Sequence, residues 1–406
     1  MPNVSVLNVL LHDHPIATLT LVQGGRTLFA FNQDYVDDSE RATLSLSFKD
    51  QFGGLITNHA PTQRVLPPFF SNLLPEGPLR SYLADRASVH QEREFFLLWM
   101  LGKDLPGAIS IKPVDGEELP PEANEAHAHG HNRALRFSLA GVQLKFSAIR
   151  NEGKGVGLTI PAEGAGGSWI VKMPSQQFSG VPENEYAMMS IAGRMGMDVP
   201  DIQLIDLEDV DGLPDGIGEL RGQALAVKRF DRSPGGSVHI EDFAQVFSKW
   251  PADKYTAGSY RSIAKVLGIE TGEDGIVEYV RRIIFNTLIG NADMHLKNWS
   301  LIYPNKKTPR LAPAYDFLST IPYLQDETAA LKYSRTKRMY EVSKDEIAHL
   351  ASKALLPEKI VVGTALDTVR RFRDIWEAEK THFPLAKKVI EAVEAHAARV
   401  PIYNEA

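Results

Sequence analysis

The sequence predicts an α+β protein that consists of a small α+β unit, a strand-rich lobe and a helical lobe, in that order along the chain. Short stretches that alternate apolar and polar residues fill the first 50 positions and return between residues 134 and 230. After residue 230, apolar residues recur mainly at helical spacing. The length of 406 residues also exceeds the size at which one hydrophobic core usually stops growing.

Residues 1–113 are expected to form the small α+β unit. Strand-like alternation in "VSVLNVLL", "IATLTLV", "TLFAF" and "ATLSLSF" predicts an antiparallel sheet, with turns at "QGG" and "DDSE". The pattern becomes helical from Phe69 to Leu101, and "PGAISIKP" predicts a return to a strand.

Residues 114–133 are acidic, contain prolines and show no periodicity, so we expect an exposed linker. His127, His129 and His131 could bind a metal through alternate side chains, but no fourth ligand is evident. A solvated linker explains the same residues.

Residues 134–230 are expected to form the strand-rich lobe, from the pieces "ALRFSLA", "QLKFSAI", "GLTI", "SWIVKMP", "IQLID" and "QALAVKRF". One helix should interrupt these strands, since apolar residues at helical spacing follow the acidic start "PENE": Met188, Ile191, Ala192 and Met195. Residues 231–406 are expected to form the helical lobe, with helices within 276–289, 365–376 and 385–397.

The composition excludes several classes of protein. A formal charge of −7 argues against a dominant nucleic-acid-binding surface. The chain has no cysteine, which removes disulfides and thiolate metal sites and fits a reducing compartment. Neither a signal segment nor a membrane span is evident, so we expect a cytoplasmic protein that does not act at a membrane.

The stretch "GNADMHLKNW" places costly polar residues directly after a predicted helix that ends at Gly290. Asp293 and Asn298 are five residues apart, which is the spacing of the acid and the metal-binding amide in the catalytic loop of kinases. Asp316 follows in the apolar context "APAYDFLST", where a carboxylate needs an ion or a charged partner. A capped loop with satisfied polar groups is the alternative.

Other residues could complete a phosphoryl-transfer site. Lys172 lies in the apolar strand "SWIVKMP", and Glu185 begins the next helix and could hold this lysine. Ser138, Ala140 and Gly141 are small enough to let backbone N–H groups approach a phosphate. An outward-facing lysine, a glutamate that complements the helix dipole and a plain hairpin are the respective alternatives.

The chain resembles the HipA-type serine/threonine kinases, which are toxins of bacterial toxin–antitoxin pairs. The resemblance runs in order through "FFSNLLPEG" (69–77), "LGKDLPGAIS" (101–110), "SLAGVQLKF" (138–146), "WIVKMP" (169–174), "NEY" (184–186), "AVKRFDR" (226–232), "GNADMHLKNWSL" (290–301) and "PAYDFLS" (313–319). It implies a two-lobed protein-kinase-like fold, with an additional N-terminal α+β subdomain that docks on the strand-rich lobe.

The resemblance also implies a role for each matching residue. Asp293 would be the catalytic acid/base, Asn298 and Asp316 the magnesium ligands, and Ser138 the site of autophosphorylation that leads to self-inactivation. The residues that would contact ATP are Lys172, Ala140, Gly141, Val142, Gln143, His295, Tyr315 and the hinge residues Lys228, Arg229 and Phe230. The sequence departs from the expected pattern at Lys228, where a glutamate is usual in the family.

The implied partners are MgATP, a helix-turn-helix antitoxin of the HipB type with its operator DNA, and a protein substrate. The family's targets include an aminoacyl-tRNA synthetase, notably the glutamyl enzyme, whose phosphorylation leads to growth arrest and persistence. Two other functions stay open from the sequence: a small-molecule or lipid kinase of related fold, and an antitoxin-binding module without catalytic activity.

Overall fold

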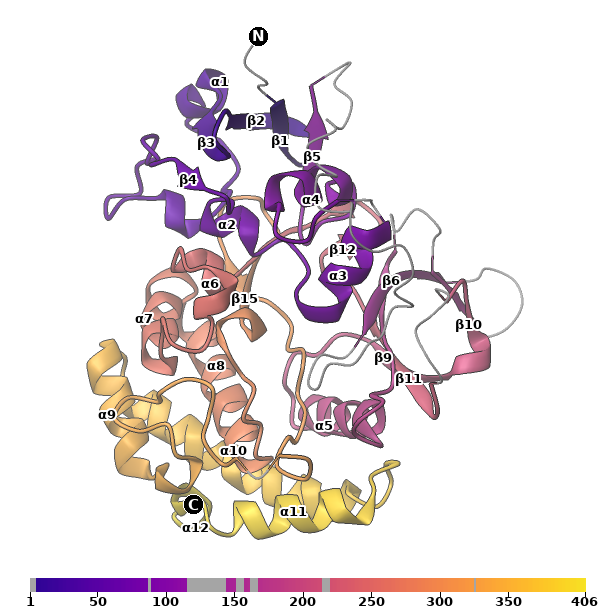
Figure 1. Ribbon diagram of the computed structural model, residues 1–406. Coiled ribbons are helices and arrows are strands. Elements are labelled where there is room, and N and C mark those ends of the chain that lie inside the picture. The colour runs from indigo at the N-terminus through magenta and orange to yellow at the C-terminus, as the bar shows by residue number, and fades with distance from the viewer. Residues whose placement is uncertain are drawn as a thin grey trace.

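The computed structural model describes residues 5–86, 89–114, 144–150, 157–160, 167–213, 220–324 and 326–406, and it confirms the mixed helix and sheet fold. Figure 1 shows an N-terminal unit in indigo and purple, a strand-rich lobe in magenta and a helical lobe in orange and yellow. Several residues of the sequence predictions lie outside the described residues: His127, His129, His131, Ser138, Ala140, Gly141, Val142 and Gln143.

The N-terminal unit contains a five-stranded antiparallel sheet in the order β4-β3-β2-β1-β5. Alternate residues of β1 such as Leu7 and Val9 are fully buried, because successive side chains of a strand point to opposite faces of the sheet. The strands are β1 (Ser5–Leu11), β2 (His14–Val22), β3 (Arg26–Phe31), β4 (Thr62–Gln63) and β5 (Ile109–Pro113). The helices are α1 (Gln33–Asp37), α2 (Pro68–Ser71), α3 (Gly77–Arg86) and α4 (Glu94–Leu101).

The predicted strand "ATLSLSF" is wrong. Residues 42–48 form a loop that ends in a short 3-10 helix, η1 (Leu46–Phe48). The Leu46 N–H and the Ser45 hydroxyl donate to the carboxylate of Glu241 in the helical lobe, so they do not pair with a neighbouring strand. The alternation arises because Leu44 and Phe48 are buried in the core of the N-terminal unit, while Leu46 packs against the core of the helical lobe, not because the segment joins the sheet.

The strand-rich lobe has a sheet in the order β10-β7-β6-β8-β11-β9. Its strands are β6 (Lys145–Arg150), β7 (Leu158–Thr159), β8 (Trp169–Lys172), β9 (Ile202–Asp206), β10 (Val210–Asp211) and β11 (Gln223–Lys228). Helix α5 (Val181–Arg194) packs against β9 and β11, and it buries Met188, Ile191 and Ala192 as its periodicity predicted. The predicted strand "ALRFSLA" lies outside the described residues.

The helical lobe is built around α8 (Gly272–Leu288), against which α7 (Tyr260–Glu270) and α10 (Glu358–Glu379) pack. The other helices are α6 (Phe243–Val246), α9 (Lys344–Ala354), α11 (Lys387–Ala397) and α12 (Pro401–Asn404). Helices α8, α10 and α11 confirm the three that the sequence predicted. No helix in the described ranges has both the length and the apolar surface to cross a membrane.

The sequence did not predict the small strands of the helical lobe, which are too short to leave a clear alternation. A hairpin of β12 (Arg232–Ser233) and β13 (Gly236–Ser237) is followed by a three-stranded sheet of β14 (His239–Asp242), β15 (Ser300–Tyr303) and β16 (Arg310–Leu311). Strand β15 begins two residues after Asn298, so this sheet fixes one end of the loop that carries this predicted metal ligand.

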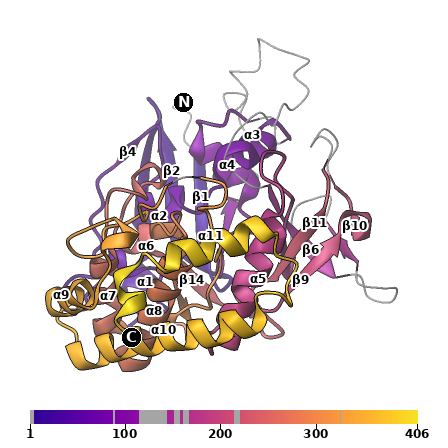
Figure 2. The same ribbon diagram turned by 90° about the horizontal axis from the view of Figure 1, so that it is seen from below.

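The N-terminal unit contacts both lobes, whereas the sequence implied docking on the strand-rich lobe. Tyr82 of α3 packs edge-on against Phe146 of β6, with ring centroids 6.2 Å apart. Polar contacts join the same unit to the helical lobe, where His239 Nε2 donates to the carbonyl of Leu44 at 2.7 Å. Figure 1 shows α10 and α11 at the end of the molecule away from the N-terminal unit. In Figure 2, which views the molecule from that end, α11 lies in front.

Stability should depend on pH through Glu241, whose buried carboxylate joins the N-terminal unit to the helical lobe. Burial raises its pKa to about 7, although hydrogen bonds from Ser45 and Tyr303 oppose this shift. This pKa lies above the ordinary value of 4.5, so the folded protein binds the proton of Glu241 more tightly than the unfolded chain does. The resulting stabilisation is fully present below pH 4.5 and is lost as the pH rises through 7. In thermal melts from about pH 5 to pH 8, the Tm of Glu241→Gln should therefore rise relative to wild type.

The matched control is Glu391→Gln, which removes an exposed carboxylate from α11. Its difference in Tm from wild type should stay constant over the same pH range. A constant difference for Glu241→Gln as well would contradict the assignment of this titration to Glu241.

Candidate active site

The loop of the candidate site begins where the buried helix α8 ends. Gly290 has a φ of +67°, and a Cβ atom there would lie 2.5 Å from Ile321 Cδ1, so glycine is needed at this turn. The buried Asn291 then fixes the loop: its Nδ2 donates to Asn286 Oδ1 at 2.9 Å and to the carbonyl of Asp316 at 3.2 Å. Its Oδ1 accepts from the N–H of Asp293 at 3.1 Å. One asparagine thus ties Asp293 to the segment that carries Asp316.

The Asp293 carboxylate accepts a hydrogen bond of 2.7 Å from the hydroxyl of Tyr255. Burial raises the pKa of Asp293, and the bond from Tyr255 opposes this shift. Tyr255 is 39% exposed, and its ring lies edge-on to His295 with centroids 4.9 Å apart. The Asp293 carboxylate is therefore hydrogen-bonded to a tyrosine that is itself partly exposed. The sequence reasoning missed Tyr255, because nothing in its local pattern relates it to a loop 38 residues away.

Asn298 and Asp316 present oxygen atoms side by side. Asn298 Nδ2 donates to Asp316 Oδ2 at 2.8 Å, while Asn298 Oδ1 is buried and has no hydrogen-bond partner among the described residues. An unpartnered buried carbonyl oxygen beside a carboxylate is a pair of ligands that suits magnesium. Asp316 itself has a φ of +57°, so the backbone is held in a left-handed conformation at this residue.

Lys172 joins the two lobes at the site. Its ammonium group, on β8, contacts the carboxylates of both Glu185 on α5 and Asp316 in the helical lobe. Burial alone would lower the pKa of Lys172, but the two carboxylates outweigh it and raise this pKa. Burial also tends to raise the pKa of Asp316, yet the Lys172 charge lowers it to about 2. Burial raises the pKa of Glu185 and the negative charge of Asp316 adds to this effect, while the charge of Lys172 opposes it.

A second lysine that the sequence reasoning missed stands beside Lys172. Lys145 of β6 pairs directly with Lys172 in the antiparallel register, so the two side chains leave the same face of the sheet. Burial lowers the pKa of Lys145, and the charge of Lys172 adds to this effect, while Asp316 opposes it. Lys145 nevertheless reaches solvent. The register that places two cations together follows from the sheet and not from the local sequence.

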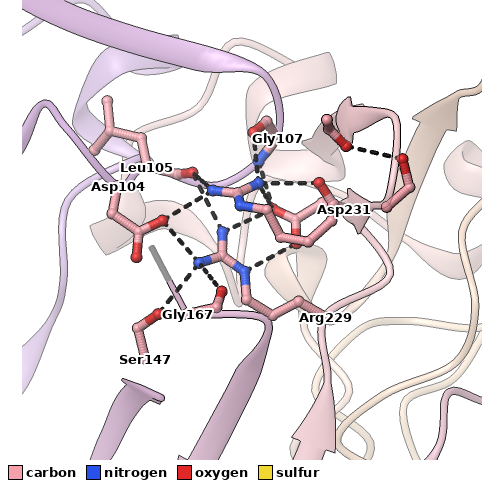
Figure 3. Close-up of polar contacts among 10 residues, drawn as sticks. Asp104, Leu105, Gly107, Ser147, Gly167, Arg229 and Asp231 are labelled. Carbon is pink, nitrogen blue, oxygen red and sulfur yellow. Dashed lines mark hydrogen bonds and ion pairs between the residues drawn. The ribbon is translucent and has the colours of Figure 1, made fainter. Parts of the chain in front are cut away.

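The predicted hinge residues differ in what they face. The Arg229 guanidinium points into a buried junction, where it contacts Asp231 at 2.9 Å and Asp104 of the N-terminal unit at 2.8 Å (Figure 3). Lys228 forms an exposed ion pair with Asp201 at 2.8 Å. Both charges are thus engaged with protein carboxylates. The N–H groups of Lys228 and Arg229 are engaged as well, since they donate to the carbonyls of Asp201 and Ser168, each at 2.8 Å.

Phe230, Tyr315 and His295 lie close to the loop. The rings of Phe230 and Tyr315 are 5.8 Å apart, and the Tyr315 hydroxyl donates to the carbonyl of Lys297 at 2.9 Å. His295 is buried, and burial together with the charge of Lys254 lowers its pKa to about 3, so the ring is neutral at physiological pH. Its Nδ1 finds no hydrogen-bond partner within the described ranges. These side chains offer aromatic surface and a buried, unpartnered ring nitrogen near the oxygens of Asn298 and Asp316.

A cavity of about 280 Å³ lies elsewhere, between α7, α8 and the start of α10. Its lining is mostly apolar, and none of the residues above contributes to it. The polar constellation around Lys172 and Asp316 therefore remains the candidate site.

Family models match both halves of the chain. The model of the HipA N-terminal domain matches residues 7–112, and that of the HipA-like C-terminal domain matches residues 137–376. The second match alone covers more than half of the chain and contains Lys172, Asp293 and Asp316.

Curated relatives and solved structures agree with this match. A protein of Sinorhizobium fredii whose name assigns it to the kinases, Y4dM, is 63% identical over 406 residues, which cover all of this chain and 99% of that protein. The serine/threonine-protein kinase toxin HipA of Shewanella oneidensis is 27% identical over 303 residues, or 64% of this chain and 65% of that protein.

A solved structure of HipA from Shewanella oneidensis, in complex with HipB and operator DNA, has the same fold. The two chains superpose with a TM-score of 0.71 at 21% identity, over 98% of this chain and 96% of that one. Together with the matches of both domain models and the relative that is 63% identical, this shows that the chain belongs to the HipA family of kinases.

Proposed function

We propose that this protein is an ATP-dependent serine/threonine protein kinase of the HipA toxin type. The observation that carries the proposal is the contact between the Lys172 ammonium of one lobe and the Asp316 carboxylate of the other, with Asn298 bonded to the same carboxylate. A triphosphate with magnesium needs a cation and oxygen ligands within reach of one another. Asn291 links Asp293 to this group, so an acceptor for a hydroxyl proton lies in the same loop.

In this proposal each residue has one task. Asn298 and Asp316 hold magnesium, which neutralises charge on the ATP phosphates. Lys172 and Lys145 contact phosphate oxygens, and Asp293 accepts the proton of the attacking hydroxyl. The bond from the γ-phosphorus to the bridging oxygen breaks, a bond to the serine or threonine oxygen forms, and ADP leaves. Burial of Asp293 raises its pKa and so makes its carboxylate a stronger base.

The nucleotide base is assigned to the region of Phe230, Tyr315 and His295, where aromatic rings and a neutral imidazole meet. In this proposal the hinge segment Lys228 to Phe230 contacts adenine through backbone groups other than the N–H groups of Lys228 and Arg229, which donate within the protein, because the charges of these two residues are already paired. The lysine in place of the family's usual glutamate is then compatible with ATP binding. Residues Ala140 to Gln143 are proposed to cover the phosphates.

The biological role is proposed from the family. A helix-turn-helix antitoxin of the HipB type would bind this protein and operator DNA, as the solved complex of the Shewanella oneidensis proteins suggests. The substrate would be a component of translation, such as the glutamyl-tRNA synthetase, with growth arrest and persistence as the result. The proposal includes boundaries after residues 113, 133 and 230, although α3 contributes Tyr82 to the strand-rich lobe.

Asp293→Asn should reduce the transfer of labelled phosphate from MgATP to protein by at least about a hundredfold, because the amide cannot accept the hydroxyl proton. Its Tm should stay close to that of wild type. Asp367→Asn, which removes an exposed carboxylate that pairs with Arg371 on α10, should keep full activity. Retained transfer by Asp293→Asn would remove this residue from the mechanism, and transfer only to lipid or aminoglycoside panels would favour a related small-molecule kinase.

Asp316→Asn should lose the magnesium-dependent part of the rise in Tm that ATP causes, because a carboxylate ligand is replaced by a neutral amide. Lys172 keeps Glu185 as its partner in this variant, so the protein should still fold. Thermal melts with ATP, in magnesium or in excess chelator, measure the effect. If magnesium adds as much to the Tm of Asp316→Asn as to that of wild type, Asp316 is not a ligand.

Ser138→Ala should abolish the gain of one phosphate in intact mass after incubation with MgATP, if Ser138 is the site of autophosphorylation as we propose. Wild type should gain this mass, and Asp293→Asn should not. Equal phosphate on wild type and Ser138→Ala would refute the assignment to Ser138 while leaving the kinase activity itself supported.

A further inference from the structure

A carboxylate of the N-terminal unit reaches the catalytic loop of the helical lobe. Glu76, in the turn between α2 and α3, accepts from the ammonium groups of Lys254 and Lys297, each at 2.7 Å. The two lysines come from different segments of the helical lobe, and both are less than one fifth exposed. Glu76 and Lys297 lie in two of the stretches that carry the family resemblance, "FFSNLLPEG" and "GNADMHLKNWSL", but the sequence analysis gave neither residue a role.

The first lysine leads to the proposed base. Lys254 directly precedes Tyr255, whose hydroxyl donates to Asp293 at 2.7 Å. The carbonyl of Lys254 accepts from the N–H of Leu296 in the catalytic loop at 3.2 Å. A displacement of Lys254 would therefore move both the tyrosine that holds Asp293 and the loop that follows it.

The second lysine leads to the proposed metal ligands. Lys297 directly precedes Asn298, and its carbonyl accepts from the Tyr315 hydroxyl at 2.9 Å. Its ammonium also donates to the carbonyl of Asn72 in the N-terminal unit at 3.2 Å. The side chain of Asn72 in turn donates to the carbonyl of Lys249 at 2.7 Å. Asn72 is therefore hydrogen-bonded to two separate segments of the helical lobe.

The charges of Glu76, Lys254 and Lys297 explain why this one carboxylate holds the two lysine segments together. Burial would raise the pKa of Glu76, but Lys297 and Lys254 outweigh it and lower the pKa to about 2, so the group is ionised at any physiological pH. Without this negative charge, two ammonium ions largely removed from water would lie close together with no carboxylate between them. Like charges in such surroundings repel strongly, so the two segments would separate.

We infer that Glu76 is a positioning residue for phosphoryl transfer: by holding Lys254 and Lys297 together, the N-terminal unit sets the positions of Asp293 and Asn298. The inference rests on the proposed kinase function. It makes the N-terminal unit a part of the catalytic centre and not only a platform beside it.

A second carboxylate of the same unit provides a matched control. Glu40 also forms an ion pair with a lysine of the helical lobe, Lys307, but both side chains are exposed. Surface pairs of this kind contribute little, and neither residue contacts the candidate site. Glu76→Gln and Glu40→Gln thus make the same chemical change in the same unit, one at the catalytic loop and one away from it.

The test measures ADP formed from MgATP by the full-length chain, with kcat and the KM for ATP determined separately. Glu76→Gln should lower kcat about tenfold or more, since small displacements of reacting groups have effects of this size, while the KM for ATP changes by a smaller factor than kcat. The KM should change less because Glu76 does not contact Lys172, Asp316 or the hinge, although Lys297 adjoins Asn298 and its carbonyl accepts from Tyr315. Glu40→Gln should match wild type in both constants.

If Glu76→Gln fails to fold, Glu76→Asp replaces it, with Glu40→Asp as control. The shorter aspartate keeps the charge but cannot hold both ammonium groups, so kcat should still fall while that of Glu40→Asp does not. A kcat of the Glu76 variant equal to that of its control, or a loss confined to KM, would overturn the inference. An inactive wild type would instead contradict the proposed function, so the two failures are distinguishable.

Discussion

The contact between Lys172 and Asp316 is the interaction on which the rest of the site depends, because it joins the two lobes at the candidate site. An ammonium group on a buried strand needs a carboxylate, and Glu185 of the same lobe supplies only one of the two that Lys172 contacts. The second comes from a loop of the other lobe, which Asn291 and Asn298 hold in place. The need to pair one buried charge thus brings the proposed phosphate-binding and metal-binding residues together.

The N-terminal unit follows the same physical rule at two further points. Asp104 meets Arg229 beside the hinge, and Asp231 completes a buried junction that contains parts of all three units (Figure 3). Glu76 meets two lysines at the catalytic loop. Removing one partner of such a buried group leaves an uncompensated charge, which is strongly destabilising. The hinge and the loop after α8 are therefore both connected to the N-terminal unit through buried or partly buried ionic contacts, which tolerate little displacement.

Local signals explain why much of the fold could be predicted. The end of α8 at Gly290, the strand of Lys172 and the buried face of α5 each follow from a few consecutive residues. The segment 42–48 was misread for the same reason: its alternation is real, but its backbone bonds to Glu241 and not to a strand. A pattern of burial reports that alternate residues are covered, and it does not report which part of the chain covers them.

The sequence by itself determined the order of the three units and the polar loop after α8, because each depends on neighbours within a few positions, and through the family resemblance it predicted residues that would bind ATP and magnesium. Only the tertiary structure decided that Lys145 lies beside Lys172 and that the Tyr255 hydroxyl donates to the Asp293 carboxylate. It also decided that Glu76 pairs with Lys297 in the loop after α8. These contacts join residues far apart in the chain, and they form because buried charges and polar groups must find partners wherever the folded backbone presents them.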